Sequence, residues 1–438
     1  MIDSVNSALP PLRVALLGCG VVGSQVARLL IESPADLEAR AGRPLSLVGV
    51  GVRHPRAERP GLDPALLTGD TDRLVTEADI VVEVIGGLEP ARRLILSAIG
   101  HGASVVTANK ALLAAHGPEL FAAAQRAGVD LYFEAAVAGA IPIIRPLRES
   151  LVGDEITSVM GVVNGTTNYI LDQMTTHGLS FSDALVQAQA LGFAEADPSA
   201  DIDGYDAAAK ASILASLAFH TEVSGADVYR EGIATITGED IEAAAALGYV
   251  VKLLAVATLV DGGRERVSVR VHPAMVPLDH PLAMVRGGYN AVFVESRNAG
   301  RLMFLGPGAG GAPTASAVMG DLVTVARNRH RGTNGPALTP YTNRAVAPIG
   351  DAVTRYYLAL PVHDAPGVLA RIASVFAKHG VSISAVRQTE SPDQAGTALL
   401  GIMTHAARDA EVQDTVAELK TDSRAVIGRI RHMRVEGA

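Results

Sequence analysis

The chain has 438 residues, of which 48% are hydrophobic and 19% charged, with a net charge of −9 and a pI near 5.7. This length exceeds one ordinary hydrophobic core, so we expect two or three domains, and the composition excludes a disordered protein. The negative charge argues against a dedicated nucleic-acid-binding protein, which would present a basic surface.

The sequence gives no sign of a membrane segment or an export signal. Its first residues lack the basic and apolar regions of a secretory signal. No apolar run reaches the roughly 18–20 residues that span a bilayer, because Lys252 interrupts the candidate at Val250–Val260. The single cysteine, Cys19, excludes an intramolecular disulfide. We therefore expect a cytoplasmic protein with neither a membrane nor a nucleic acid as partner.

The first third of the chain alternates short apolar runs with helical stretches. Strands are predicted at Leu12–Leu17, Leu45–Val52, Ala78–Ile85, Ala103–Thr107 and Val129–Ala135. Helices are predicted at Ser24–Ile31, Pro90–Ile99 and Ala111–Ala127. Apolar strands separated by helices indicate a parallel sheet covered on both faces. We expect an α/β fold here, a doubly wound parallel sheet of the Rossmann type over residues 1–150, completed by part of 305–330.

The pattern changes in the middle of the chain. A strand at residues 156–163 leads through Asn164-Gly165-Thr166-Thr167 into a helix near Asn168. Further helices are predicted at Leu185–Leu191 and Tyr205–Phe219, strands at Val267–His272 and Ala291–Glu295, and another helix from Thr314. This mixture predicts an α+β domain for substrate binding and dimerisation at 151–327.

Residues 328–351 are rich in Gly, Pro, Asn and Thr, which predicts a linker. A compact module is expected after it, at 352–438. Its predicted strands are Tyr356–Val362, Val381–Arg387, Ala398–Thr404 and Val426–Arg434, and its predicted helices are Val368–His379 and Ala410–Leu419. This βαββαβ order is typical of a ferredoxin-like fold.

A glycine motif follows the first strand and opens the first helix. Gly18, Gly20 and Gly23 form G-x-G-x-x-G, with Val21 and Val22 between the last two glycines. In a strand–turn–helix context this motif predicts a dinucleotide site, in which backbone N–H groups at the helix N-terminus meet the pyrophosphate. The alternative is an ordinary glycine-rich turn, which the surrounding βαβ pattern disfavours.

The residues after the second strand bear on the choice of dinucleotide. An NAD-selective site usually places an acidic residue there. This chain instead has Arg53, and an arginine is able to meet the 2′-phosphate of NADP. We therefore expect NADPH as the preferred cofactor, with NADH as the alternative if Arg53 is only a solvated loop cation.

Six ordered motifs together resemble homoserine dehydrogenase over essentially the full length of the chain. Each alone is weak, but their order is specific. They are the glycine loop, Thr107-Ala108-Asn109-Lys110, residues 134–142 (EAAVAGAIP), residues 163–168 (VNGTTN), residues 192–198 (GFAEADP), and residues 201–210 (DIDGYDAAAK). The C-terminal module, with residues 362–369 (VHDAPGVL), looks like an ACT domain.

The resemblance implies interconversion of L-aspartate 4-semialdehyde and L-homoserine, a step toward threonine, methionine and isoleucine. It makes Lys210 the proton donor and places Lys110 near the nicotinamide and the substrate. A positioned acid suits this chemistry because hydride delivery to an aldehyde builds negative charge on its oxygen. Without the resemblance, Lys210 would be read as an exposed i,i+4 partner of Asp206.

The same resemblance implies further ligand contacts. Glu195 and Asp206 would meet the substrate ammonium, with the backbone of Gly192 nearby. Carbonyls of Glu134, Val137, Gly139 and Ile141 would hold a monovalent cation, most plausibly Na⁺, as oxygen ligands suit a hard cation. Calcium is rejected for the Asp201–Asp206 cluster, because the EF-hand spacing is not met.

Two glycines are expected beside the cofactor. Gly308 would bring its backbone close to it, the alternative being a flexible turn. Gly86 would offer its backbone just after the predicted strand Ala78–Ile85, where relatives of the family can carry hydroxyl residues near the nicotinamide. That departure puts a side-chain contact at this point in doubt.

The ACT-like module suggests regulation by a small amino acid. The loop Asp364–Gly367 opens a helix whose first N–H groups would receive a carboxylate, most plausibly that of threonine as an end product. The alternative is a dimerisation module without a ligand. Homodimers or homotetramers are the family expectation. For the whole chain, two other functions remain open: another amino-acid dehydrogenase, or a nucleotide-responsive regulator without catalysis.

Overall fold

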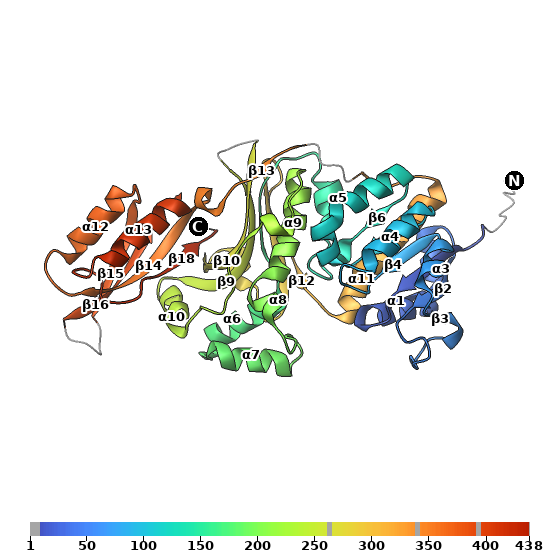
Figure 1. The fold of residues 1–438 in the computed structure, drawn as a ribbon, viewed down its shortest axis with the longest axis horizontal. Coiled ribbons are helices and arrows are strands. Elements are labelled where there is room, and N and C mark those ends of the chain that lie inside the picture. The colour runs from blue at the N-terminus through green and yellow to red at the C-terminus, as the bar shows by residue number, and fades with distance from the viewer. Residues whose placement is uncertain (1–8, 261–264, 338–341, 391–395, 438) are drawn as a thin grey trace.

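The computed structural model describes residues 9–260, 265–337, 342–390 and 396–437. Figure 1 shows three parts in a row: the N-terminal domain at one end, a long curved sheet in the middle, and the C-terminal domain at the other end. Within the described residues, no helix has both the length and the apolar character needed to cross a membrane.

The N-terminal domain is a parallel sheet in the order β3-β2-β1-β4-β5-β6. This order, with its reversal between β1 and β4, is the one expected of a Rossmann sheet. The strands are β1 (Leu12–Leu17), β2 (Leu45–Gly51), β3 (Leu67–Thr68), β4 (Ile80–Glu83), β5 (Ser104–Thr107) and β6 (Leu131–Tyr132).

Helices cover both faces of this sheet. One face packs against α1 (Val21–Glu32), α2 (Pro34–Ala41) and α11 (Gly311–Arg331). The other packs against α3 (Thr71–Thr76), α4 (Ala91–Gly100) and α5 (Lys110–Ala127). The chain thus returns from the middle domain to complete the first one with α11. This helix ends at Arg331, three residues beyond the predicted start of the linker at 328.

The middle domain is a mixed sheet covered by helices on one side (Figure 1). Its main strands run in the order β12-β11-β7-β9-β10. They are β7 (Ile156–Val162), β9 (Tyr249–Leu259), β10 (Arg266–Pro277), β11 (Tyr289–Ser296) and β12 (Gly300–Pro307), with the short β8 (Tyr229–Arg230) and β13 (Ala345–Val346) beside β10. The helices are α6 (Gly165–His177), α7 (Phe181–Ala190), α8 (Ser199–Ile202), α9 (Tyr205–Phe219) and α10 (Gly238–Ala246).

The C-terminal domain has the predicted βαββαβ order. Its sheet runs β18-β14-β16-β15, and two helices cover one face. The elements are β14 (Val353–His363), α12 (Val368–Lys378), β15 (Ile383–Glu390), β16 (Thr397–Thr404), β17 (Ala407–Arg408), α13 (Asp409–Thr421) and β18 (Arg431–Val435).

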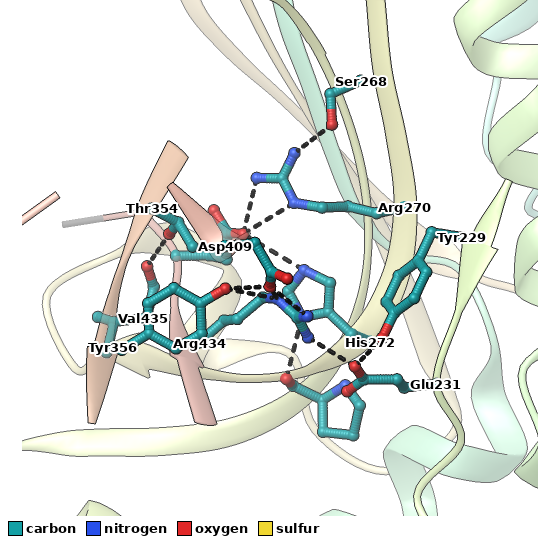
Figure 2. Close-up of polar contacts among 12 residues, drawn as sticks. Tyr229, Glu231, Ser268, Arg270, His272, Thr354, Tyr356, Asp409, Arg434 and Val435 are labelled. Atoms are coloured by element: carbon teal, nitrogen blue, oxygen red, sulfur yellow. Dashed lines mark hydrogen bonds and ion pairs between the residues drawn. The ribbon is translucent and has the colours of Figure 1, made fainter. Parts of the chain in front are cut away.

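The middle and C-terminal sheets are one continuous sheet. Strand β18 pairs in parallel with β10, so that Ala274 lies opposite Arg434. Figure 2 shows the buried polar cluster at this junction. Arg434 Nη2 lies 2.6 Å from Asp409 Oδ1, and Arg270 Nη2 lies 2.7 Å from Glu436 Oε1. Arg434 Nη1 also lies 2.9 Å from Glu231 Oε1, so the pairs Arg434–Glu231 and Arg270–Glu436 fix the C-terminal domain to the middle domain.

Several predicted elements differ from the observed ones. The strand expected at Val129–Ala135 is only Leu131–Tyr132, because a 3-10 turn follows at Glu134–Ala136. The strand expected at Val426–Arg434 begins only at Arg431, and Val426 makes a single bridge to Val362. Helix α6 begins at Gly165 because Asn164 caps its N-terminus. The predicted linker lies partly outside the described residues, at 338–341.

Candidate active site

The glycine loop has the geometry that a pyrophosphate needs. Gly18 has a φ of +99°, and a Cβ on Gly23 would lie 2.2 Å from the Gly18 carbonyl oxygen, so neither position tolerates a side chain. By contrast, no atom lies within 4 Å of a Cβ built on Gly20. Helix α1 starts at Val21 without a side-chain cap, which leaves its first N–H groups for an anion. These features fit a dinucleotide phosphate.

The N-terminus of α11 lies beside the same loop. A Cβ on Gly311 would be 2.8 Å from the Val21 carbonyl oxygen. Just before this helix, Gly308 packs closely on Gly139, whose Cβ would lie 2.5 Å from the Gly308 oxygen. The predicted cofactor residue Gly308 and the predicted cation residue Gly139 are therefore neighbours.

Asn290 was not found from the sequence. Its amide lies directly against Gly308, where a Cβ would be 2.1 Å from Asn290 Cγ. The residue is 1% exposed, and neither amide atom has a hydrogen-bond partner within the described residues. A buried amide without hydrogen bonds costs free energy, so we expect a polar ligand, ion or water molecule beside it. No sequence signal marks it, because Asn290 stands in an apolar strand pattern.

The two predicted catalytic lysines share one carboxylate. Lys110 Nζ lies 2.6 Å from Asp206 Oδ1, and Lys210 Nζ lies 2.6 Å from Asp206 Oδ2. Lys110 is the first residue of α5, just after β5, while Asp206 and Lys210 are one turn apart on α9. The Lys210 side chain is 9% exposed and that of Lys110 is 44% exposed. The reading of Lys210 as an exposed surface pair is therefore wrong.

Burial and charge move the pKa values in this centre in opposite directions. Burial lowers the pKa of Lys210, although Asp206 opposes the shift. Burial alone would also lower the pKa of Lys110, but Asp206 outweighs it and that pKa is raised. Burial opposes ionisation of Asp206, yet the two ammonium groups hold its pKa well below the ordinary value. Lys210 is thus the ammonium that gives up its proton more readily.

Backbone and amide groups from the VNGTTN motif position the centre. Lys210 Nζ also donates to the Val163 carbonyl at 2.7 Å, at the end of β7. Asn164 Nδ2 donates to Asp206 Oδ2 at 2.9 Å and to Asp201 Oδ1 at 2.6 Å. The same side chain caps α6 through its bond to the Thr167 N–H. The sequence pointed to this motif only through the resemblance, and Asn164 itself was missed as a site residue.

The predicted substrate loop lies next to this centre. Glu195 is exposed, and its carboxylate is one of the negative groups that raise the pKa of Lys110. Gly192 has a φ of +77°. The loop is held by Thr166, whose hydroxyl donates to the Phe193 carbonyl at 2.6 Å.

The predicted cation segment is buried and strained. Ala138 and Gly139 have consecutive positive φ values of 57° and 59°. Among the described residues, no backbone donor reaches the buried carbonyls of Val137 or Gly139. Buried carbonyls without donors fit a cation. The Glu134 carbonyl is a weaker candidate, since it accepts from the Val137 N–H at 3.4 Å. Ile141 is buried beside them.

The Glu134 side chain has a structural role. Its two oxygens accept from the N–H groups of residues 143–145 at 2.6–3.0 Å. No group of three or more His, Cys, Asp or Glu side chains in the described residues is arranged to hold a metal ion.

Glu83 turns inward at the end of β4. It is fully buried, and it accepts from the Thr107 hydroxyl at 2.6 Å and from the Gly86 N–H at 3.1 Å. The N–H of Gly86 is therefore engaged within the protein, and only its carbonyl is left for a cofactor.

Three arginines, Arg53, Arg56 and Arg59, lie on the loop after β2, and two of them bear on cofactor binding. Arg53 is exposed, so its guanidinium is accessible to the phosphate of a cofactor. Arg59 was missed. Burial raises the pKa of the Cys19 thiol and the Arg59 guanidinium opposes that rise, which places Arg59 beside the glycine loop. It lies six residues after Arg53, where no motif indicates it.

Comparisons with known proteins cover the whole chain. A model described as "Homoserine dehydrogenase" matches residues 142–323, its "NAD binding domain" matches 18–134, and an ACT domain matches 357–421. The homoserine dehydrogenase of Mycobacterium tuberculosis is 55% identical over 434 residues, 98% of each chain. That of Corynebacterium glutamicum is 52% identical over 411 residues, 93% of this chain and 92% of the other.

Solved structures give the same result. The homoserine dehydrogenase of Thiobacillus denitrificans has a TM-score of 0.90 at 40% identity, covering 98% of this chain and 99% of that one. A hyperthermophilic archaeal homoserine dehydrogenase in complex with NADPH has a TM-score of 0.62 at 28% identity, covering 75% and 100%.

The fold and the site define an NAD(P)-dependent oxidoreductase that acts on a CH–OH group. The chain belongs to the homoserine dehydrogenase family, with an NAD-binding domain, a catalytic domain and a C-terminal ACT domain.

Proposed function

We propose that this homoserine dehydrogenase reduces L-aspartate 4-semialdehyde to L-homoserine in the cytoplasm, reversibly and with NADPH as preferred cofactor, in threonine, methionine and isoleucine biosynthesis. The observation that carries the chemistry is the buried Lys210–Asp206–Lys110 centre. When bound, the reduced cofactor supplies a hydride. The chain supplies the proton and the charge that the reacting oxygen needs.

Lys210 is the proton donor in this proposal. Negative charge builds on the aldehyde oxygen as its carbon is reduced, and the buried ammonium of Lys210 meets that charge and gives up a proton. Its lowered pKa favours this role, because the proton is lost more readily than from an ordinary lysine. Lys110, whose pKa is raised, stays charged and orients the substrate and cofactor.

The role of Asp206 follows from its contacts. Its oxygens accept from both lysines and from Asn164, so we assign it to holding the lysines rather than to the substrate ammonium. Glu195 remains for the ammonium, because its carboxylate is exposed near Lys110. The backbone at Gly192 completes the substrate contact.

A monovalent cation, Na⁺ in this proposal, lies among the carbonyls of Glu134, Val137, Gly139 and Ile141. Support comes from the buried carbonyls of Val137 and Gly139 and from the unpaired Asn290 amide on the other side of Gly308. Bound there, the cation would fix the Gly139–Gly308 contact. It would thereby fix the backbone that approaches the cofactor.

The ACT domain is proposed to bind threonine at the Asp364–Gly367 loop and to lower activity. Gly367 has a φ of +89° and precedes α12 without a side-chain cap, which leaves N–H groups for a carboxylate. Removing residues 352–438 is then expected to abolish inhibition by threonine, and inhibition that survives would refute sensing by this domain. A homodimer or homotetramer stays our prediction for the assembly.

The experiment that tests the function is an absorbance assay. Homoserine-dependent reduction of NADP⁺ is expected, with a lower Michaelis constant than for NAD⁺. Replacing Arg53 by Ala is expected to raise the Michaelis constant for NADP⁺ far more than for NAD⁺, because only the former has a 2′-phosphate. No turnover of homoserine would overturn the proposed reaction, and equal effects on both cofactors would overturn the role of Arg53.

A further inference from the structure

A crevice lies between helix α10 of the middle domain and one face of the C-terminal part of the sheet. It is a cavity of about 370 Å³ between α10 and the sheet face that carries neither α12 nor α13. Its floor comes from β14, β15, β16 and β18, and its wall from one side of α10. This volume lies within the usual range of small-molecule sites.

The two faces of the C-terminal sheet have different contacts: one carries residues of the buried junction and the other lines the crevice. Successive residues of a strand point to opposite faces. Tyr356 and Arg434 are directly opposite on β14 and β18, and they belong to the buried cluster at the junction (Figure 2). Their neighbour Tyr357 faces the crevice with Arg431. The buried junction and the crevice therefore lie on opposite faces of the same strands.

The floor of the crevice is shaped for a small ligand. Gly401 has no side chain, and the Tyr357 ring occupies the space that one would fill, with its Oη 3.2 Å from a Cβ built on Gly401. Leu247 and Met403 add apolar surface on the two sides. A short aliphatic group fits such surroundings better than a long one.

Opposite charges line the crevice without meeting. Arg387 on β15 and Glu242 on α10 both line it with exposed side chains, and no ion pair or hydrogen bond joins either to another residue in the described ranges. Arg431 differs, because its Nη1 is paired with Glu239 and its Nε lies 3.6 Å from Asp240. The crevice thus separates one available cation from one available anion.

We propose that this crevice binds a free α-amino acid with a short side chain, its carboxylate on Arg387 and its ammonium on Glu242. A zwitterion of that kind pairs with both side-chain charges at once. Its hydrogen bonds to them are charge-assisted, which makes them stronger than bonds between neutral groups. This site is separate from the Asp364–Gly367 loop. It rests on the proposed regulation by an amino acid and gives that regulation a second location.

The position of the crevice gives the ligand a route to the catalytic centre. Helix α10 packs against α6 and β9. The N-terminus of α6 is capped by Asn164, which donates to Asp206. A ligand that draws α10 toward the C-terminal sheet therefore acts on the element that positions the lysine pair. Inhibition through this site lowers kcat more than it raises the Michaelis constant for homoserine.

Calorimetric titration of the full-length enzyme tests the site, with L-threonine, L-isoleucine and L-methionine as probes. Arg387→Gln and Glu242→Gln are each expected to weaken binding of the probe that binds best by tenfold or more. Arg424→Gln, an exposed arginine of the same domain outside the crevice, is the matched control and is expected to leave binding unchanged. Homoserine turnover without effector is expected to be the same in all these variants.

Analogues identify which charge each residue meets. L-threoninamide lacks the carboxylate, so Arg387→Gln is expected to weaken L-threonine binding but not that of the amide. The proposal is overturned if no probe binds, or if Asp364→Asn weakens binding while both crevice variants bind normally. Failure of the proposed reaction would show separately, as absent homoserine turnover in the unaltered enzyme.

Discussion

Lys210 is the residue on which the chemistry depends most directly. Lys210→Gln removes the proton donor while keeping a polar side chain, so kcat for homoserine oxidation is expected to fall about 10²–10⁴-fold. The dissociation constant for the cofactor, measured by fluorescence titration, is expected to stay nearly unchanged. Lys420→Gln, on the exposed side of α13, serves as the control. A kcat within threefold of the unaltered enzyme would exclude Lys210 as the acid.

The pH profile gives a second test at the same residue. Burial lowers the pKa of Lys210, so its proton is lost at a lower pH than for an ordinary lysine. Reduction of the aldehyde needs the protonated form and declines as the pH rises through that value. Asp206 opposes the shift, so Asp206→Asn is expected to move the decline to lower pH and to reduce kcat. The measurement is kcat for the reduction between pH 6 and 10, and an unmoved midpoint would contradict it.

Sequence reasoning found the lysines but not their arrangement. Lys110 and Lys210 stand in motifs, so a resemblance was enough to select them. One carboxylate contacts both lysines because β5 and β7 end where α9 begins, and no local pattern in the sequence encodes this arrangement. Asn164 shows the same limit, because its amide reaches a residue 42 positions away.

The turn between β1 and α1 carries a prediction at the scale of an element. Gly20→Ala is expected to leave thermal stability unchanged, because nothing lies within 4 Å of the added Cβ. The same methyl group stands where the backbone meets a pyrophosphate, so dinucleotide affinity is expected to fall at least tenfold. Gly100→Ala on α4, which also meets nothing within 4 Å, is the control.

The two effects of Gly20→Ala separate cofactor binding from folding. A loss of thermal stability equal to the loss of affinity would show that the loop, and not the ligand, needs this glycine. Gly23→Ala provides the contrast, since its Cβ would lie 2.2 Å from the Gly18 oxygen. That variant is expected to lose both stability and affinity.

Elements with a strong local pattern were predicted well. Strand β1 and helix α9 have the predicted ends, Leu12–Leu17 and Tyr205–Phe219. Strand β9 was missed, because Lys252 interrupts its apolar run. The structure explains this lysine: it is fully buried and donates to Asn168 at 2.9 Å and to the Val285 carbonyl at 2.6 Å. Hydrophobic periodicity does not predict a buried lysine whose partners are distant in the sequence.

The whole molecule depends on a junction that no sequence pattern indicated. Both domains were expected, but not their common sheet, because β10 and β18 pair across 160 residues. In the sequence, the arginines and carboxylates of that junction look like ordinary solvent-facing polar residues. Only their burial against one another, shown in Figure 2, reveals that they join the domains.

Glu436 makes this junction sensitive to acid. Burial would raise the pKa of Glu436, but Arg270 and His272 outweigh it and lower the pKa to about 2. A carboxyl group with a lowered pKa stabilises the fold at pH values above its ordinary pKa near 4.5, and this stability is lost as the pH falls from 4.5 toward 2.

Glu436→Gln is therefore expected to lower the free energy of unfolding by about 3–5 kcal/mol near neutral pH. The difference in Tm between the two proteins is expected to shrink between pH 4.5 and 2, as thermal unfolding followed by calorimetry would show. Glu58→Gln, an exposed control, is expected to show no such difference, and a gap that stays constant with pH would mean that the Glu436 charge does not hold the domains together.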